Sequence, residues 1–330
     1  MRKPTPRATV GLAALLCLAA VFVAPFVGSE PVAPLRAWSD LLTLPRAAWS
    51  PDAAILGLRL PRILLALLSG AGLAVAGAVM QSLLRNPLAS PYTLGAATAA
   101  SLGAFAGVVL GAGAVARPGP ALVLAVLDVV LVLAVARRSR RPDGLVLAGV
   151  TLNFAFGAGV LLLRHLARPT DLAAMERWLL GSLEAVDAGP SLALLPWLAV
   201  GFTLLARRVG DLDQLAFHPA LAEARGVAAD AVRREGLLAA GLLTAAVVAQ
   251  AGPIGFVGLL VPHVVRPGTG LRHAWLLPGC ALAGGGFLVL ADAVARSLDW
   301  FGRTSDLPVG VVTALLGGPA FLALLLRRSS

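Results

Sequence analysis

The chain has 330 residues, of which 58% are hydrophobic and only 13% charged, and its mean hydropathy is +0.86. Soluble domains carry about 25% charged residues, so the composition excludes an ordinary soluble protein and predicts an all-α polytopic membrane protein. The net charge of +10 comes almost entirely from arginine. Because these arginines lie at the ends of apolar runs, we expect them to anchor helices, and we expect no nucleic-acid partner.

Apolar segments follow one another along the whole chain, and we expect about ten transmembrane helices in one domain covering residues 1–330. Their approximate limits are 8–28, 63–84, 93–116, 120–136, 144–163, 189–206, 237–252, 254–265, 274–295 and 307–326. The segment 254–265 is too short to cross a hydrocarbon core of roughly 30 Å as a straight helix. Since it lies between Gly252-Pro253 and Pro262-His263, it predicts a short broken helix buried in protein.

The stretch from Leu58 to Gly95 has the most informative pattern. Arg59 and Arg62 flank Pro61, and the apolar segment that follows is rich in glycine and alanine before it ends at the polar turn 85–91. Small residues let neighbouring membrane helices approach closely. We therefore expect the segment 63–84 to lie at the centre of the bundle.

Loop charges predict the orientation of the chain. If the N-terminus is cytoplasmic, most of the arginines fall in the cytoplasmic loops, which favours both termini inside. The longest of these loops, 207–236, mixes charged and apolar residues at helical spacing. Two short amphipathic helices are expected in it, around Pro219–Arg225 and Ala228–Glu235. The pattern alone fits either a solvated connector or a docking surface for a cytoplasmic partner.

Known catalytic and metal-binding motifs are missing from the sequence. Lys3 is the only lysine, so the chain cannot form a Walker A site, which needs a lysine after its glycines. The sequence contains no HExxH, no paired-cysteine motif and no GxSxG. We therefore predict a protein that is not an enzyme, with no catalytic residues, no cofactor and no metal site.

Two aspartates lie inside apolar segments. Asp292 precedes Arg296 by four residues, a spacing that allows an ion pair within one helix. Asp128 has no partner of this kind, and a carboxylate within a membrane is a functional candidate. It could be hydrogen-bonded in a crevice, it could lie near an interface, or it could couple transport to an ion. The alternative function is thus an ion- or proton-coupled secondary transporter using Asp128. A third reading, an integral-membrane enzyme, lacks a polar catalytic cluster.

Several long motifs resemble the FecCD family, the permease subunits of bacterial ABC importers for iron-siderophores, haem, cobalamin and related metal chelates. These motifs are RLPR (59–62), GAVMQSLLRNPLASPYTLG (77–95), LAGV (147–150), GPIGFVGLLVPHVVR (252–266), LLPGCALAGGGFLVLADAVAR (276–296) and LPVGVVTALLGGPAFLALLLRR (307–328). They occur in the family's order over nearly the whole chain, although the first 50 or so residues are not diagnostic.

The resemblance implies a multi-pass protein of the cell inner membrane, with two halves of inverted topology formed by spans 2–5 and 7–10. It also implies a second permease subunit, so that the chain forms a homodimer. Further expected partners are cytoplasmic ABC ATPase subunits, which supply the ATP hydrolysis, and a periplasmic or lipid-anchored substrate-binding protein.

Individual residues acquire expected roles from the family. Arg59, Arg62 and Arg296 match arginines that meet glutamates of the binding protein, a pairing suited to the planar guanidinium, while simple interfacial anchoring is the alternative. The loop 207–236 matches the ATPase coupling loop, although its sequence departs from the family pattern. Its expected contact residues are Phe217, His218, Pro219, Glu223, Arg225 and Gly226. Asn153, Phe154 and Thr313 are expected to line the transport pathway.

Overall fold

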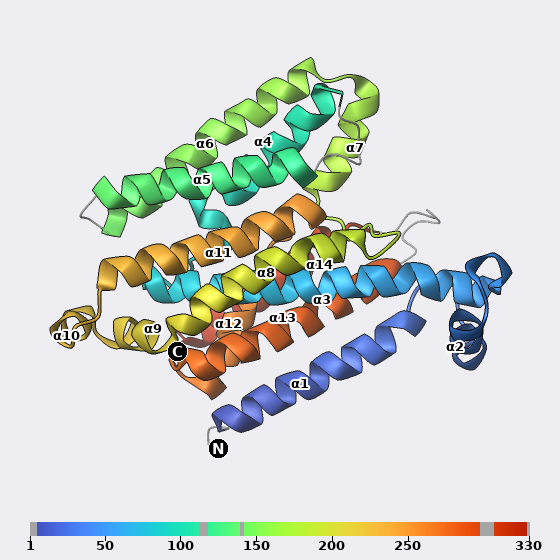
Figure 1. Ribbon diagram of the computed structural model, residues 1–330, viewed down its shortest axis with the longest axis horizontal. Coiled ribbons are helices and arrows are strands. Elements are labelled where there is room, and N and C mark those ends of the chain that lie inside the picture. The colour runs from blue at the N-terminus through green and yellow to red at the C-terminus, as the bar shows by residue number, and fades with distance from the viewer. Residues whose placement is uncertain (1–4, 112–117, 139–141, 298–306, 329–330) are drawn as a thin grey trace.

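The computed structural model describes residues 5–111, 118–138, 142–297 and 307–328, and these residues are almost entirely helical (Figure 1). The α-helices in chain order are α1 (Pro6–Val23), α2 (Pro34–Thr43), α3 (Pro51–Leu83), α4 (Ala96–Val109), α5 (Pro118–Arg138), α6 (Pro142–Leu166), α7 (Pro169–Leu179), α8 (Gly189–Arg207), α9 (Val209–Phe217), α10 (Pro219–Ala224), α11 (Ala229–Ala251), α12 (Val257–Thr269), α13 (His273–Ser297) and α14 (Val309–Arg328). Three short 3-10 turns, η1 (Ala24–Phe26), η2 (Arg46–Ala48) and η3 (Pro91–Leu94), connect some of them.

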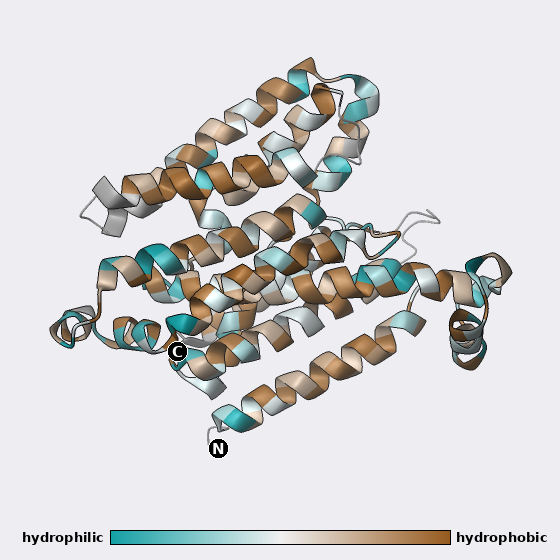
Figure 2. Ribbon diagram, in the orientation of Figure 1, coloured by the Kyte–Doolittle hydropathy of each residue, from teal (hydrophilic) through white to brown (hydrophobic). Residues whose placement is uncertain are grey.

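Each predicted apolar segment overlaps a helix, and the end of the segment 93–116 lies outside the described residues. Within the described ranges, six helices are long and apolar enough to cross a membrane: α1 continued by η1, α3, α5, α6, α8 and α13. The apolar parts of α4 and α14 are shorter. Hydrophobic residues run along these helices, and hydrophilic residues gather toward the ends of the bundle (Figure 2). The all-α polytopic fold class is thereby confirmed.

Helix α3 begins at Pro51, well before the predicted start at residue 63. Its N-terminus is capped by Ser50, whose Oγ accepts a hydrogen bond from the Ala53 amide at 3.4 Å. Pro51 occupies the first helical position and Asp52 the first turn, and both residue types suit a helix start. The helix continues through Pro61, so Arg59 and Arg62 lie within α3 and not before it.

The central position predicted for α3 is confirmed. In its span, 78% of the residues are buried, against 6% in the span of α6. The contact between α3 and α13 is the most extensive between any two described helices. Where α3 meets α12, a Cβ on Gly77 would lie 1.8 Å from the Gly258 carbonyl oxygen. Neither glycine carries a side chain, so the two backbones approach closely at this point.

Helix α3 lies within one group of helices, which includes α8, α11, α12 and α13, and a second group lies beside it. Helices α4, α5 and α6 pack together with α7 and meet the rest of the bundle through α11, while α1 packs on α13 (Figure 1). Helix α1 begins, and α14 ends, at the end of the bundle that carries α9 and α10. Helix α2 lies at the opposite end.

The short broken helix predicted near 254–265 corresponds to α12. A non-helical stretch separates it from α11, with left-handed φ values at Gly252 (68°) and Phe256 (66°). The second amphipathic helix predicted in the loop 207–236 is corrected, because 229–235 forms the first turns of α11. The second short helix of that loop is instead α9. Helices α2 and α7 are additional to the prediction.

Candidate functional site

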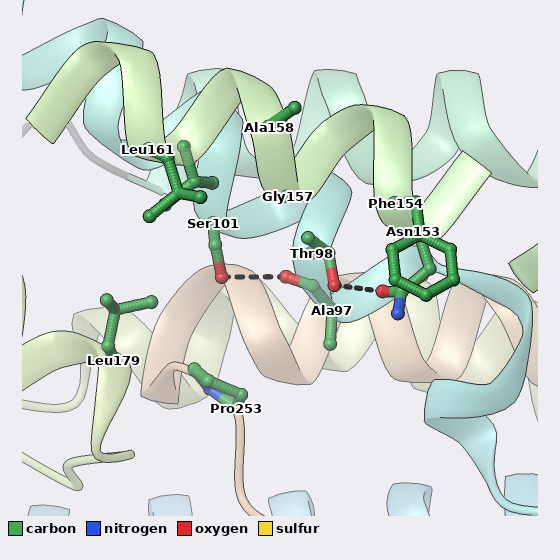
Figure 3. A pocket seen from close by; sticks show the side chains of 11 residues that line it. Ala97, Thr98, Ser101, Asn153, Phe154, Gly157, Ala158, Leu161, Leu179 and Pro253 are labelled. Atoms are coloured by element: carbon green, nitrogen blue, oxygen red, sulfur yellow. Dashed lines mark hydrogen bonds between the residues drawn. The ribbon is translucent and has the colours of Figure 1, made fainter. Parts of the chain in front are cut away.

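A cavity of about 660 Å³ lies between α4, α6, the end of α7 and Pro253 (Figure 3). Asn153 and Phe154, predicted to line a transport pathway, both line it. Thr98 on α4 donates its hydroxyl to Asn153 Oδ1 on α6, and Ser101 donates to the Ala97 carbonyl at 2.8 Å. The other residues that line the cavity have apolar side chains or are glycine. The cavity therefore offers a few hydrogen-bonding groups on an apolar wall.

Thr313 lies elsewhere. Its side chain is fully buried and donates to the Gly310 carbonyl at 3.0 Å, and it is not among the residues that line this cavity. The structure thus brings two of the three predicted pathway residues together and leaves the third inside the packing of α14.

At the end of the bundle that carries α2, two buried arginines bind the segment between α1 and α2. Arg59, 7% exposed, donates to the carbonyls of Pro25 at 2.9 Å and Glu30 at 2.7 Å. Arg296, 6% exposed, donates to the carbonyls of Val27 and Ala24, both at 3.1 Å. These bonds connect residues 24–30 to α3 and α13.

Asp292 joins the second and third of the predicted docking arginines. Its fully buried carboxylate accepts hydrogen bonds from Arg62 Nε at 2.7 Å and from Arg296 Nε at 3.0 Å. The predicted ion pair between Asp292 and Arg296 is therefore confirmed. All three guanidinium groups bond within the chain, so a partner carboxylate would compete with these bonds.

A cavity of about 360 Å³ opens beside this cluster, lined by Arg59, Arg62 and Arg296 together with Glu30 and Glu184. Its wall thus carries charges of both signs. Contact of these arginines with a binding protein stays a prediction.

At the other end of the bundle, the loop 207–236 presents α10 to solvent. Phe217 is 77% exposed and Leu221 is 42% exposed, and Glu223 and Arg225 are also exposed. His218, in extended conformation, precedes α10, and Pro219 occupies its first position.

Gly226 ends α10 with a left-handed φ of 85°. Its amide donates to the Glu223 carbonyl at 2.9 Å, and the Val227 amide donates to the Ala222 carbonyl at 3.0 Å. This is the Schellman arrangement, in which glycine supplies the left-handed residue. The position of Gly226 is thus explained by chain geometry.

Helix α9 is fixed to the bundle by side chains on both of its flanks. Arg208 forms a bidentate salt bridge with the carboxylate of Glu235 on α11, and both N···O distances are 2.8 Å. Arg85, just beyond α3, donates to the Leu215 carbonyl at 3.3 Å. The exposed α10 is therefore continuous with a helix that is held against the membrane-spanning core.

A chain of hydrogen bonds connects α9 to α13 and α3. Asp213 Oδ1 accepts from the His273 amide at 2.6 Å and lies 2.7 Å from His273 Nδ1, while His273 Nε2 lies 3.0 Å from Ser82 Oγ. Burial favours a raised pKa for Asp213, but the two hydrogen bonds from His273, together with nearby Arg272, lower its pKa overall. Sequence reasoning missed this contact because 60 residues separate Asp213 from His273.

Asp128 is fully buried on α5, and neither carboxylate oxygen has a hydrogen-bond partner among the described residues. The adjoining space is about 10 Å³, and apart from Asp128 it is lined by apolar and glycine residues of α3, η3, α4, α5 and α11. That is room for about one water molecule. The surroundings of Asp128 therefore do not resemble a pathway for an ion.

Comparison with known proteins gives a consistent result. The model of the FecCD transport family matches residues 15–327. The Fe(3+)-citrate import system permease protein YfmE of Bacillus subtilis is 35% identical, with 98% of each chain covered. The Fe(3+) dicitrate permease protein FecD of Escherichia coli is 39% identical over 88% of this chain and 90% of its own. The vitamin B12 import system permease protein BtuC of Salmonella typhi is 39% identical over 82% of this chain and 83% of its own.

A solved structure agrees with these relatives. A transporter assigned to the metal-chelate type of ABC transporters, in an inward-facing conformation, superposes with a TM-score of 0.84 at 27% identity, covering 98% of this chain and 100% of its own. From the family match and these relatives, the chain belongs to the FecCD transport family.

Proposed function

We propose that the chain is the membrane-spanning subunit of an ABC importer that carries a ferric chelate inward, with cobalamin as the second substrate class. The observation that carries this proposal is the likeness, over 98% of both chains, to an Fe(3+)-citrate import permease. The cavity of about 660 Å³ is within the size range of small-molecule sites. Its apolar wall with scattered hydrogen-bonding groups suits a bulky chelate that passes through without tight binding.

The second copy of the chain is expected to complete this cavity. The span of α6 is only 6% buried, and large apolar side chains such as Phe154 (74% exposed) and Leu161 (66%) project from it. Phe154 and Leu161 also line the cavity, so the cavity wall and the exposed face of α6 are continuous. A homodimer formed across this face would enclose the substrate between two copies of α6.

The end of the bundle that carries α9 and α10 is the proposed cytoplasmic end, with both chain termini on the same side. The exposed Phe217 and Leu221 supply apolar contacts for an ATPase subunit, and the neighbouring Glu223 and Arg225 supply polar ones. ATP is hydrolysed by that partner and not by this chain. Movement of α10 reaches the core through α9, whose bonds to Glu235, His273 and Arg85 connect it to the spanning helices.

The opposite end receives the substrate-binding protein in a multi-pass protein of the inner membrane. The cavity beside Arg62, Glu30 and Glu184 offers both a cation and anions to such a partner. Arg59 and Arg296 hold residues 24–30 at this surface through hydrogen bonds to their backbone carbonyls.

The proposal is tested by reconstituting the chain with its ATPase and binding protein in proteoliposomes and measuring uptake of labelled ferric citrate and cobalamin. Asn153→Ala removes a side chain that lines the cavity and is expected to change the uptake rate while basal ATP hydrolysis is unchanged. Thr151→Ala is the matched control, because Thr151 is exposed on α6 and is not among the residues that line the cavity, and its hydroxyl donates to the Leu147 carbonyl at 2.8 Å. Equal uptake by both variants would contradict the proposed pathway.

A further inference from the structure

Helix α2 has an exposed apolar stripe that no described part of the chain covers. Leu35 is 91% exposed, Leu42 is 74% exposed and Trp38 is 37% exposed. At 3.6 residues per turn, these three side chains fall within an arc of about 60° on the helix. Scattered exposed apolar residues are ordinary on any surface, but a continuous stripe along one helix has a physical cause.

The surface of α2 divides into three faces. Ala37 is fully buried and Leu41 half-buried, and this face lies against α3. Arg36, Ser39 and Thr43 are exposed along a second, polar face. The stripe Leu35, Trp38 and Leu42 is the third face. A helix that contacts only protein and water needs one buried face and one polar face. The additional exposed apolar face of α2 therefore indicates contact with a third environment.

The segment after α2 holds the helix in place. Trp49 Nε1 donates to the Leu44 carbonyl at 3.0 Å, and the Arg46 guanidinium lies 5.5 Å from the centre of the Trp49 ring. The ring packs so closely on α3 that a Cβ on Gly57 would lie 2.5 Å from Trp49 Cζ3. The stripe is therefore presented in a fixed orientation.

The direction and position of α2 match the membrane surface. In Figure 1, α2 runs across the direction of α1 and α3 at the end of the bundle opposite α9 and α10. Helix α3 has 33 residues and is about 50 Å long, against roughly 30 Å of hydrocarbon. It therefore extends beyond the hydrocarbon core, and α2 packs on this helix where spanning helices end.

We propose that α2 is an interfacial helix whose Leu35, Trp38 and Leu42 insert among the acyl chains at the membrane boundary. Tryptophan is enriched at this depth because its ring is amphipathic. The polar side chains of α2 include one cation, Arg36, and one anion, Asp40. Insertion thus rests on apolar contact and not on attraction to anionic lipid, and it does not depend on the transported substrate.

The test uses nitroxide labels on single cysteines in the full-length chain in proteoliposomes, with Cys17 and Cys280 first replaced by alanine. Leu35→Cys and Leu42→Cys probe the stripe, and Ser39→Cys and Thr43→Cys are matched controls on the polar face of the same helix. Labels on the stripe are expected to collide more often with oxygen, which partitions into lipid, than with a water-soluble nickel complex. Labels on the polar face are expected to show the reverse, and the difference is expected to be the same in phosphatidylcholine with and without phosphatidylglycerol.

Three outcomes would overturn the proposal. Labels at 35 and 42 that are as accessible to the nickel complex as those at 39 and 43 would place the stripe in water. Labels protected from both reagents would indicate contact with a second copy of the chain. Protection that requires added binding protein would make the stripe a protein-docking surface. Size-exclusion chromatography of each variant shows whether it is folded.

Discussion

Replacing Asp292 with asparagine is the sharpest test of the buried charge cluster. The substitution keeps the side-chain volume and one carbonyl oxygen but removes the negative charge that Arg62 and Arg296 share at 2.7 and 3.0 Å. Asp292 is fully buried, and Arg296 is only 6% exposed. Removing one partner of a buried ion pair costs about 3–5 kcal/mol, because the remaining charge is left in a poorly hydrated site. We expect a loss of this size in the free energy of unfolding.

The assay is denaturant unfolding of the purified chain in mixed micelles, followed by tryptophan fluorescence. Asp230→Asn is the matched control, because Asp230 is 87% exposed and lies 3.9 Å from Arg233. Exposed pairs contribute about 0–1 kcal/mol, so its midpoint is expected to stay near that of the unmodified chain. Equal midpoints for the two variants would refute the structural role of Asp292. A loss of binding-protein affinity in Asp292→Asn without a loss of stability would favour direct docking by the arginines.

Close contacts and exposed groups lead to four further predictions. Gly77→Leu forces a side chain into the contact between α3 and α12, where an added Cβ would lie 1.8 Å from a carbonyl oxygen, and should lower the thermal midpoint by several degrees. Gly119→Leu, with open space around it, should not lower it, and equal midpoints would contradict the packing. Asp213→Asn should weaken the attachment of α9 and lower the number of substrate molecules transported per ATP hydrolysed. An unchanged ratio would show that the contact with His273 has no part in coupling. Because the pKa of Asp213 is lowered in the folded chain, its contribution to stability is present above its ordinary value of 3.8 and is lost as the pH falls through the folded value, which acid titration of unfolding checks. Phe217→Ala should weaken co-purification of the ATPase without changing the thermal midpoint, and full retention of the ATPase would remove Phe217 from the interface.

The apolar helices were predictable from sequence because each residue contributes independently to hydropathy. Runs of apolar residues identify spans whether or not their neighbours are known, and the glycine-rich pattern around Gly77 correctly placed α3 at the centre. Helix α2 was not predicted, because its apolar and polar residues alternate over only ten positions. The predicted segment began at residue 63 because the apolar run starts after Arg62, although Ser50-Pro51-Asp52 carries a helix-start signal.

The contacts within the candidate sites were not predictable, because they join residues that are distant in sequence. Asp292 and Arg296 lie four positions apart, and spacing alone predicted their pair. Arg62 meets the same carboxylate across 230 residues, which requires knowing that α3 packs on α13. Spacing also could not show that the Arg59 side chain turns inward to the carbonyls of the segment after α1.

The most direct test of the account is the energy source of uptake in proteoliposomes that contain the chain, its ATPase and its binding protein. We predict that uptake of ferric chelate requires ATP, stops when the ATPase is inactivated, and continues when ion gradients are dissipated. We also predict that Asp128→Asn retains ATP-driven uptake, since the space beside Asp128 is only about 10 Å³. Uptake that persists without the ATPase and collapses with an ion gradient or with Asp128→Asn would contradict the account and favour a secondary transporter.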